Sequence, residues 1–365
     1  MFYTETVDLK RFLRPDWDDL EPYTPVKPLD VLAAEIGLPV GDIVKLDANE
    51  NLYGPIPEIR EAIAHADLHI YPDPGQVALR VAIAGYCGVT PEQVVAGSGA
   101  DDLIDIILRV VLPNAIVNCT PTFGMYDFLG RVNGARVIEV PRLPDFAVDL
   151  PKVERAVGAG AMMVFLTSPN NPTGNVLPHE DVERLCALDA LIVIDEAYVE
   201  FGAPTSIPLL AKHPNLVILR TFSKWAGLAG LRVGYALCHP DLAACLMAIK
   251  QPYNVTVAGD VAARTAIAHR GPIMETVSMI VAERDRMARL VSELGWLKPL
   301  PSAANFVLFE VHGRAAADVA AALRRMGVLV RYYNRPDLSN YIRISAGRPQ
   351  DTDRLLAALR TLEAA

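Results

Sequence analysis

The chain has 365 residues, of which 52% are hydrophobic and 21% are charged, so it can bury a large core, and its length predicts two or three domains. Its formal net charge of -9 argues against the basic surface that binds nucleic acid or anionic membranes. No apolar run approaches the roughly 18 residues that a membrane-spanning helix needs.

The beginning of the chain and its cysteines indicate a cytoplasmic protein. Residues 1–20, MFYTETVDLKRFLRPDWDDL, are polar and acidic and lack the basic and apolar regions of a signal peptide. Five scattered cysteines without a CxxC pair are typical of reduced packing residues. The seven histidines form no HxxxH or HxH pattern, so we expect no metal site.

The first two thirds of the chain alternate between strand and helix patterns. A Pro-rich stretch at 15–39 has the character of an arm or connector. Amphipathic segments at 101–111 and 179–188 predict helices between short apolar runs. The apolar runs, which predict buried strands, are Val94–Val95, Ala115–Val117, Met162–Leu166, Leu191–Ile194 and Leu216–Leu219. This alternation predicts an α/β domain with a mostly parallel sheet.

After about Ile249 the pattern changes. Residues 262–294, rich in Ala and Arg, predict one long helix, and a further helix is expected near 315–326. Candidate strands are 305–310 (NFVLFE), 328–331 (VLVR) and 341–344 (YIRI). We therefore predict an N-terminal arm and connector (1–40), a large cofactor-binding domain (41–250) and a small α+β C-terminal domain (251–365).

Polar segments follow four of the predicted strands. They are GSGADD (97–102), TSPNNPTG (167–174), DEAY (195–198) and RTFSKWAGLAGLRVGY (220–235). Ligands of open parallel sheets bind outside the carboxyl ends of the strands, so these segments are expected at one edge. The glycines and helix start of the first segment suit a phosphate group.

Each of these segments alone has a simpler interpretation. GSGADD can be a capped helix, TSPNNPTG a turn-rich loop, and Lys224 a solvated lysine. Arg232 and Arg343 can be surface ion-pair partners. The four segments in this order favour a shared site instead.

The order and spacing of SPNNPTG, IDEAY and TFSKWAGLAGLRVGY resemble those of the class I and II aminotransferases, which are fold-type I pyridoxal-phosphate enzymes. Similar to motifs of the histidinol-phosphate aminotransferase family are LDANENLYGP (46–55), YPDP (71–74), GSGADDLI (97–104), PTFGMY (121–126) and RYYNRPDLSNYIRISAG (331–347). The resemblance covers nearly the whole chain, from about Glu21. It implies a mostly parallel seven-stranded sheet between helices in the large domain. This chain departs from the family at Asp101-Asp102, usually Asp-Glu, and at Phe123, often Tyr.

The resemblance also implies a role for each site residue. Lys224 would bond covalently to the aldehyde of pyridoxal 5'-phosphate and carry the substrate proton. Asp195 would pair with the pyridine nitrogen. Asn171 and Tyr198 would donate hydrogen bonds to the ring oxygen, and Phe123 would stack on the ring. The phosphate would be bound at Ser98, Gly99, Ala100, Thr221, Ser223 and Arg232, and by Tyr71 of a second subunit.

The substrates implied by the resemblance are L-histidinol phosphate and 2-oxoglutarate. Transamination between them yields imidazole acetol phosphate and glutamate, in histidine biosynthesis, by a homodimer with shared active sites. Arg343 would bind the substrate anion with its two-pronged guanidinium. Arg331 and Tyr23 would add to phosphate recognition, and Asn49 would line the same entry.

Other functions remain open. A threonine-phosphate decarboxylase, which is a lyase of the same fold, or an aromatic amino-acid aminotransferase would share the lysine and the aspartate. A non-enzymatic, cofactor-binding regulator would need a preceding DNA-binding module, for which we expect no room before the arm. A nicotinamide dehydrogenase would need GxGxxG after its first strand, and GSGADD does not match it.

Overall fold

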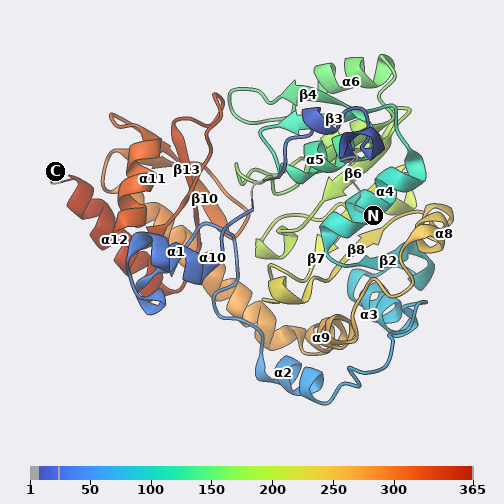
Figure 1. Cartoon of the computed structure of the whole chain (residues 1–365), viewed down its shortest axis with the longest axis horizontal. Helices are drawn as coiled ribbons and strands as arrows, with labels where there is room; N and C mark the ends of the chain where they lie inside the picture. The colour runs from blue at the N-terminus through green and yellow to red at the C-terminus, as the bar shows by residue number, and fades with distance from the viewer. Residues whose placement is uncertain (1–7, 24, 364–365) are drawn as a thin grey trace, which may run out of the picture.

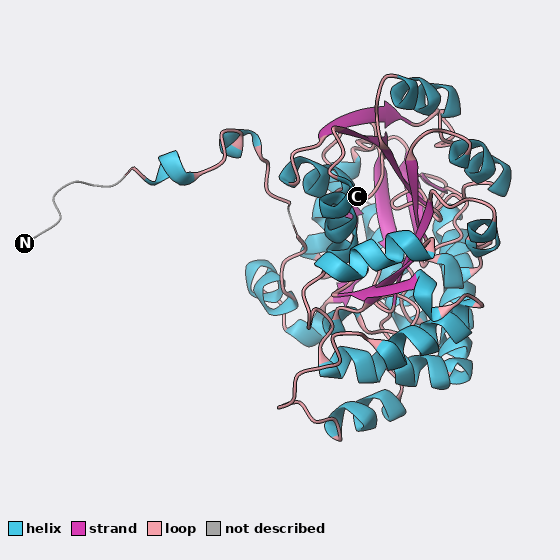
Figure 2. Ribbon diagram, turned by 90° about the vertical axis from the view of Figure 1, so that its right-hand side faces the viewer, coloured by secondary structure: helices cyan, strands magenta, loops and turns pink. Residues whose placement is uncertain are grey.

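The computed structural model describes residues 8–23 and 25–363 and has two lobes. In Figure 1 the large lobe lies to the right, the small lobe lies to the left, and helix α10 (Arg270–Ser292) runs from the one toward the other. The N-terminal arm, with the short helices η1 (Leu9–Phe12) and η2 (Trp17–Asp19), projects from the body in Figure 2.

The large lobe is built on a seven-stranded sheet, counted over the described residues, with the order β2-β8-β7-β6-β5-β3-β4. Its strands are β2 (Val94–Gly97), β3 (Ala115–Thr120), β4 (Arg136–Pro141), β5 (Met163–Thr167), β6 (Leu191–Asp195), β7 (Leu216–Thr221) and β8 (Gly234–Leu237). The strand β8 is antiparallel to β2 and β7 on either side of it, and the other pairs of neighbouring strands in this sheet are parallel. The predicted α/β class with a mostly parallel sheet is confirmed. The pattern of apolar runs did not indicate β4 or β8.

Helices cover both faces of this sheet and make two apolar cores. One core is formed with α4 (Ala100–Val111), α5 (Met125–Val132) and α8 (Pro240–Ile249). The other is formed with α2 (Pro57–Ala64), α3 (Val77–Cys87), α6 (Leu150–Gly158), α7 (His179–Cys186) and α9 (Val257–Ala268). Every residue of β2, β3, β5 and β7 is buried, as expected for strands covered on both faces.

The small lobe contains a four-stranded antiparallel sheet with the order β12-β13-β10-β9. Its strands are β9 (Leu297–Pro299), β10 (Phe306–Val311), β12 (Arg331–Tyr332) and β13 (Tyr341–Ser345), and its other helices are α11 (Ala316–Arg325) and α12 (Pro349–Glu363). Short 3-10 helices elsewhere are η3 (Val40–Asp42), η4 (Pro91–Gln93), η5 (Val199–Phe201), η6 (Ile207–Ala211) and η7 (Ala229–Leu231).

Two predicted elements are divided in the structure. The long helix expected at 262–294 is two helices, α9 and α10, separated at His269. Pro272 explains the break, because proline lacks the N–H of a helix interior but is tolerated in the first turn of a new helix. The apolar run at 328–331 is shared by β11 (Val328–Leu329) and β12, which belong to different sheets.

The segment before the large lobe is more ordered than an arm. Helix α1 (Leu29–Ile36) forms inside the Pro-rich stretch, and β1 (Val44–Lys45) pairs in parallel with β11. Val44 packs in the small-lobe core. The boundaries at residues 40 and 250 stay a prediction, and this pairing associates β1 with the small lobe. None of the helices within residues 8–23 and 25–363 has the length and apolarity to cross a bilayer.

Gly234 marks the point where β8 meets the start of α4. A Cβ at this position would lie 2.7 Å from the Ala100 nitrogen and 3.0 Å from the Arg220 oxygen, and both are backbone atoms. We therefore expect Gly234→Ala to lower the free energy of unfolding by about 1–3 kcal/mol, measured by urea denaturation. The control is Gly230→Ala, because a Cβ there meets nothing within 4 Å. Equal losses in the two variants would contradict this packing constraint.

Candidate active site

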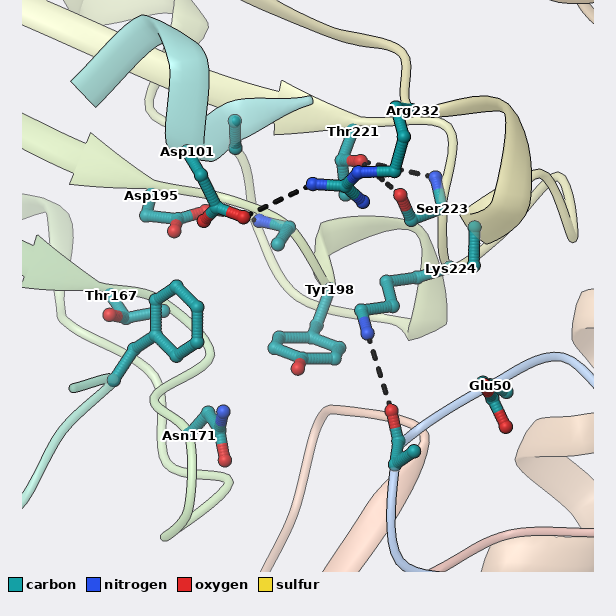
Figure 3. Close-up of a pocket in the computed structure, with 15 residues that line it drawn as sticks. Glu50, Asp101, Thr167, Asn171, Asp195, Tyr198, Thr221, Ser223, Lys224 and Arg232 are labelled. Atoms are coloured by element: carbon teal, nitrogen blue, oxygen red, sulfur yellow. Dashed lines mark hydrogen bonds and ion pairs between the residues drawn. The ribbon is translucent and has the colours of Figure 1, made fainter. Parts of the chain in front are cut away.

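The carboxyl ends of three neighbouring strands deliver polar side chains to one cavity (Figure 3). Thr167 ends β5, Asp195 ends β6 and Thr221 ends β7, and Thr167 lies beside Asp195 in the sheet register. The cavity has a volume of about 180 Å³. Of the residues predicted from the sequence, it is lined by Ala100, Phe123, Asn171, Asp195, Tyr198, Thr221, Ser223, Lys224 and Arg232.

Lys224 points into this cavity and carries a perturbed amine (Figure 3). Its Nζ lies 3.5 Å from the Ala48 carbonyl oxygen and 5.7 Å from the centroid of the Tyr198 ring. Burial, followed in size by the positive charge of Arg343, lowers the pKa of Lys224 to about 8. The amine is still mostly protonated at pH 7, but its neutral fraction is far larger than that of an ordinary lysine, and the neutral form is the nucleophile.

Asp195 is buried at the opposite side of the cavity. Its Oδ2 accepts a hydrogen bond of 2.7 Å from the Tyr126 hydroxyl, and its Oδ1 accepts one of 2.9 Å from the Ala197 N–H. Burial raises the pKa of Asp195 to about 6, although both hydrogen bonds act to lower it. A cation beside this carboxylate would keep it ionised, and a protonated pyridine nitrogen is such a cation.

No role was predicted from the sequence for Tyr126, although this residue contacts Asp195. This residue of α5 is fully buried, and its hydroxyl also lies 2.8 Å from the Thr167 Oγ1. Its ring stacks on Phe165 at a centroid distance of 5.2 Å. A signal was present in PTFGMY, since a tyrosine hydroxyl on an apolar helix face needs a buried partner. The identity of that partner depends on the fold.

The turn before α4 borders the cavity where the phosphate is predicted to bind, but two expected donors are engaged. The Ser98 N–H donates to the Asp102 Oδ2 at 2.8 Å, and the Gly99 N–H donates to the Gly97 oxygen at 2.8 Å. No side chain caps the start of α4, and Ala100 lines the cavity. Phosphate binding at these three residues stays a prediction, with the Ala100 N–H as the best-placed backbone donor.

Side-chain donors surround the same turn. The Arg232 Nη2 lies 3.1 Å from the Asp101 Oδ2, and a Cβ on Gly99 would come within 2.5 Å of this nitrogen. The Thr221 and Ser223 hydroxyl oxygens are 2.9 Å apart. A guanidinium, two hydroxyls and a helix N-terminus suit a phosphate dianion. Together with Asp195 and Lys224, these groups fit pyridoxal phosphate.

A second chamber of about 320 Å³ adjoins the first and shares Lys224 with it. Arg343 lies here: its Nη1 donates to the Asn171 Oδ1 at 2.6 Å, and its Nη2 donates to the Asp47 carbonyl oxygen at 2.6 Å. Its buried Nε has no partner among the described residues, so a donor remains for a substrate anion. Because the Asn171 oxygen is engaged, the amide nitrogen is free to donate into the first cavity.

Asn49 lines the second chamber and also orients Tyr198. The Asn49 Nδ2 donates to the Tyr198 hydroxyl oxygen at 3.0 Å, and its Oδ1 accepts a hydrogen bond of 2.8 Å from the Ser345 hydroxyl. Asn49 is buried and has a positive φ of 55°. Burial raises the pKa of Tyr198, so its hydroxyl stays protonated and can donate to the cofactor ring oxygen.

The outer wall of the second chamber combines the arm with the small lobe. Tyr23 meets the Phe123 ring edge-on at a centroid distance of 6.5 Å, and Arg331 lies 5.6 Å from the centroid of the Tyr333 ring. Arg335, which sequence reasoning did not single out, also lines this wall. The structure thus brings Tyr23 and Arg331 together with Arg343, while their roles in substrate binding stay predictions.

Tyr71 lies away from the active-site cavity of its own chain. Its side chain is 78% exposed and stacks on Tyr253 at a centroid distance of 4.6 Å. It lines a separate surface pocket. A contribution of Tyr71 to an active site would therefore have to be made in a second subunit.

Comparison with known proteins identifies the family. Residues 41–359 match the family model of class I and II aminotransferases. A histidinol-phosphate aminotransferase from Roseiflexus castenholzii is 49% identical in an alignment of 360 positions that covers 95% of this chain and 97% of the relative. The chain belongs to the histidinol-phosphate aminotransferase family. Family membership confirms the predicted enzyme class, an aminotransferase.

Other relatives agree with this assignment. The chloroplastic histidinol-phosphate aminotransferase 1 of Arabidopsis thaliana is 44% identical, over 96% of this chain and 85% of its own length. The crystal structure of histidinol-phosphate aminotransferase from Sinorhizobium meliloti in complex with pyridoxal-5'-phosphate has a TM-score of 0.85 at 32% identity, and the match covers 93% of this chain and 95% of that one. A threonine-phosphate decarboxylase structure from Porphyromonas gingivalis, at 22% identity, shows the fold alone.

The pKa of Lys224 can be tested through its covalent reaction with pyridoxal phosphate. Since only the neutral amine attacks an aldehyde, the rate of capture by the apo protein should rise through about pH 8. Because Arg343 lowers this pKa, Arg343→Gln should move the midpoint to higher pH. The measurement is borohydride reduction at a series of pH values, with mass spectrometry of the Lys224 peptide.

The matched control is Arg335→Gln, because Arg335 lines the same chamber but is not among the charges that shift the pKa of Lys224. Its midpoint should equal that of the unaltered protein. A midpoint unchanged or lowered in Arg343→Gln, or a label on a different lysine, would refute the electrostatic account.

Proposed function

We propose that this enzyme transfers the amino group of L-histidinol phosphate to 2-oxoglutarate, giving imidazole acetol phosphate and glutamate, and that it works as a cytoplasmic homodimer. The cofactor is pyridoxal 5'-phosphate, as in the Sinorhizobium meliloti relative. The observation that carries the proposal is the chamber in which Arg343, Arg331 and Tyr23 adjoin Lys224. This chamber offers cationic and hydroxyl groups to an anionic substrate beside the reactive amine.

Side chains of the first cavity prepare the reaction. The cofactor supplies an electron sink for the negative charge left when the substrate gives up its proton. Asp195 would hold the ring nitrogen protonated, and this would keep the sink strong. Asn171 and Tyr198 would donate hydrogen bonds to the ring oxygen. The Lys224 amine would take the proton from the substrate carbon as a general base and later return it as a general acid.

The second chamber binds the substrate anion. Arg343 already donates to Asn171 and to the Asp47 carbonyl oxygen, so its guanidinium is held in place before substrate arrives. Arg331 and Tyr23 lie on the outer wall, where the phosphate of histidinol phosphate would be bound. A shared set of arginines also suits the carboxylates of 2-oxoglutarate, the second substrate.

Arg331→Ala should separate phosphorylated from non-phosphorylated amino donors. Because a hydrogen bond to a charged group contributes about 1.5–3 kcal/mol, kcat/KM for histidinol phosphate should fall about 10- to 100-fold, and that for phenylalanine much less. Glutamate formation from 2-oxoglutarate measures both. A panel with tyrosine and threonine phosphate, with carbon dioxide also recorded, tests the aromatic aminotransferase and the decarboxylase. Equal losses for both donors would argue against phosphate recognition by Arg331.

The surface around Tyr71 supports the proposed homodimer. Leu68, Ile70 and Tyr71 are exposed by 64%, 57% and 78%, and Tyr253 beside them by 46%. A cluster of large exposed apolar side chains is typical of an interaction surface. With two-fold symmetry, the Tyr71 of each subunit would serve the cofactor phosphate of its partner.

Mixed dimers test this arrangement. Lys224→Ala and Tyr71→Ala should each be impaired as homodimers, but a mixed dimer has one intact site, with Lys224 from one chain and Tyr71 from the other. Random assortment of equal amounts makes half of the dimers mixed, so about a quarter of all sites should recover. Coexpression of differently tagged chains followed by an activity assay measures the recovery.

The control pairs Lys224→Ala with Asp195→Asn. Both residues belong to the same chain's cavity, so neither site of that mixed dimer is intact and no recovery is expected. If Tyr71→Ala recovers no more activity than this control, Tyr71 does not act across the interface.

A further inference from the structure

Two consecutive residues between α8 and α9, Tyr253 and Asn254, contact the exposed Tyr71 and the first turn of α4, respectively. The Tyr253 ring stacks on Tyr71, with centroids 4.6 Å apart and an interplanar angle of 23°. The next side chain, Asn254, donates from its Nδ2 to the Asp102 Oδ2 at 2.8 Å. Asp102 belongs to the first turn of α4, which borders the cavity where the phosphate is predicted to bind. One short segment therefore joins the Tyr71 surface to the phosphate-binding turn.

The Asp102 carboxylate stabilises the turn before α4 through a hydrogen bond with its backbone. The same Oδ2 that accepts from Asn254 also accepts the Ser98 N–H at 2.8 Å. Hydrogen bonds to an ionised carboxylate are roughly twice as strong as neutral ones. A carboxylate in the first turn of a helix is also favoured by the helix dipole. The conformation of the turn that ends at Ala100 thus depends on the Asp102 Oδ2, and Asn254 helps to hold this oxygen in place by donating a hydrogen bond to it.

Gln76 continues the chain of contacts toward Tyr71. Its Nε2 donates to the Asn254 Oδ1 at 2.9 Å and to the Ala96 oxygen at 3.0 Å, while its Oε1 accepts the Ala96 N–H at 3.1 Å. Its side-chain amide therefore pairs with the backbone of β2, the edge strand of the sheet. Gln76 has a positive φ of 53°, which is unfavourable for a side-chain-bearing residue. Such strain persists where surrounding contacts over-determine the conformation.

The loop between Tyr71 and Gln76 is tied to the same segment. The N–H groups of Gly75 and Val77 donate to the Asp73 carboxylate at 2.8 Å each. The buried Lys250 donates to the Pro74 oxygen at 2.9 Å, and its Nζ also lies 3.3 Å from the Pro252 oxygen. Loop and segment are thereby held together, so a displacement of Asn254 would be transmitted to the loop.

We propose that Asn254 is a positioning residue which, together with Asp102 and Gln76, couples the phosphate-binding turn to the Tyr71 loop of the same chain. Cofactor phosphate at the turn orders this chain of hydrogen bonds and, through it, the loop. The consequence for the partner subunit rests on the proposed homodimer: occupancy of one site positions the Tyr71 that completes the other. By linkage the coupling is reciprocal, so loop order also strengthens phosphate binding.

Hydrogen exchange measured with and without pyridoxal phosphate tests the coupling directly. The experiment uses full-length protein carrying Tyr71→Ala, so that a direct contact of Tyr71 with a partner's cofactor cannot protect the loop. Cofactor loading should slow exchange of the Gly75–Val77 amides in this protein. Adding Asn254→Ala should abolish most of that protection. It should also weaken cofactor binding about 5- to 20-fold, as measured by titration.

Asn215→Ala is the matched control, because its side-chain amide also donates to backbone oxygens, those of Cys186 and Ala190, but lies just before β7. Gln76→Glu is a second variant. It keeps the shape of the side chain but replaces the Nε2 that donates to Asn254 with a carboxylate oxygen, which cannot donate. Equal loop protection in Asn254→Ala and Asn215→Ala overturns the proposal. If Asn254→Ala does not fold, unchanged loop protection in Gln76→Glu overturns it. Since Tyr71 is absent throughout, this outcome is independent of the mixed-dimer test.

Discussion

A buried ion pair holds together the strand ends on which the active site is built. The Arg220 Nε and Nη2 donate to the Glu196 Oε2 at 3.0 and 2.8 Å, and both side chains are buried. Glu196 directly follows Asp195, and Arg220 directly precedes Thr221. The pair therefore fixes the ends of β6 and β7 relative to each other at the point where they carry Asp195 and Thr221, which are predicted to bind the cofactor. Loss of Arg220 would leave the Glu196 carboxylate buried without its cation, which costs about 3–5 kcal/mol.

The remaining groups of the site come from outside this framework and reach it through a few contacts. Asn49, which lies in the chain between β1 and α2, orients Tyr198. Arg343 of the small-lobe strand β13 reaches across to Asn171. The second chamber thus forms only where the two lobes meet, whereas Asp195 and Thr221 lie within the sheet of the large lobe alone. A movement of the small lobe would therefore change the second chamber more than the first cavity.

The features of the site that could be predicted from the sequence are those that depend on residues close together in the chain. Asp195 directly follows one apolar run, and Lys224 lies a few residues beyond the end of another, so the edge rule for parallel sheets places both at one site. The contacts of Tyr126 with Asp195 and of Asn254 with Asp102 are formed between residues far apart in the chain, and no local pattern specifies them. Local chemistry also misled in one respect: GSGADD suggested free amides at Ser98 and Gly99, but the Asp102 side chain and the Gly97 oxygen accept from them.

The two perturbed pKa values explain how the cofactor and the fold depend on each other. Burial raises the pKa of Asp195 to about 6. Without a cationic partner, the folded state therefore loses stability as pH rises from about 4 to about 6, because the buried carboxyl ionises less readily than it does in the unfolded chain. This loss of stability persists at higher pH. Burial lowers the pKa of Lys224 to about 8, so its ammonium form carries a penalty below that pH. Both penalties are present at neutral pH. A cation beside Asp195 relieves the first, and covalent bonding of the Lys224 amine relieves the second. The same burial that makes both groups reactive therefore adds to the affinity for the cofactor.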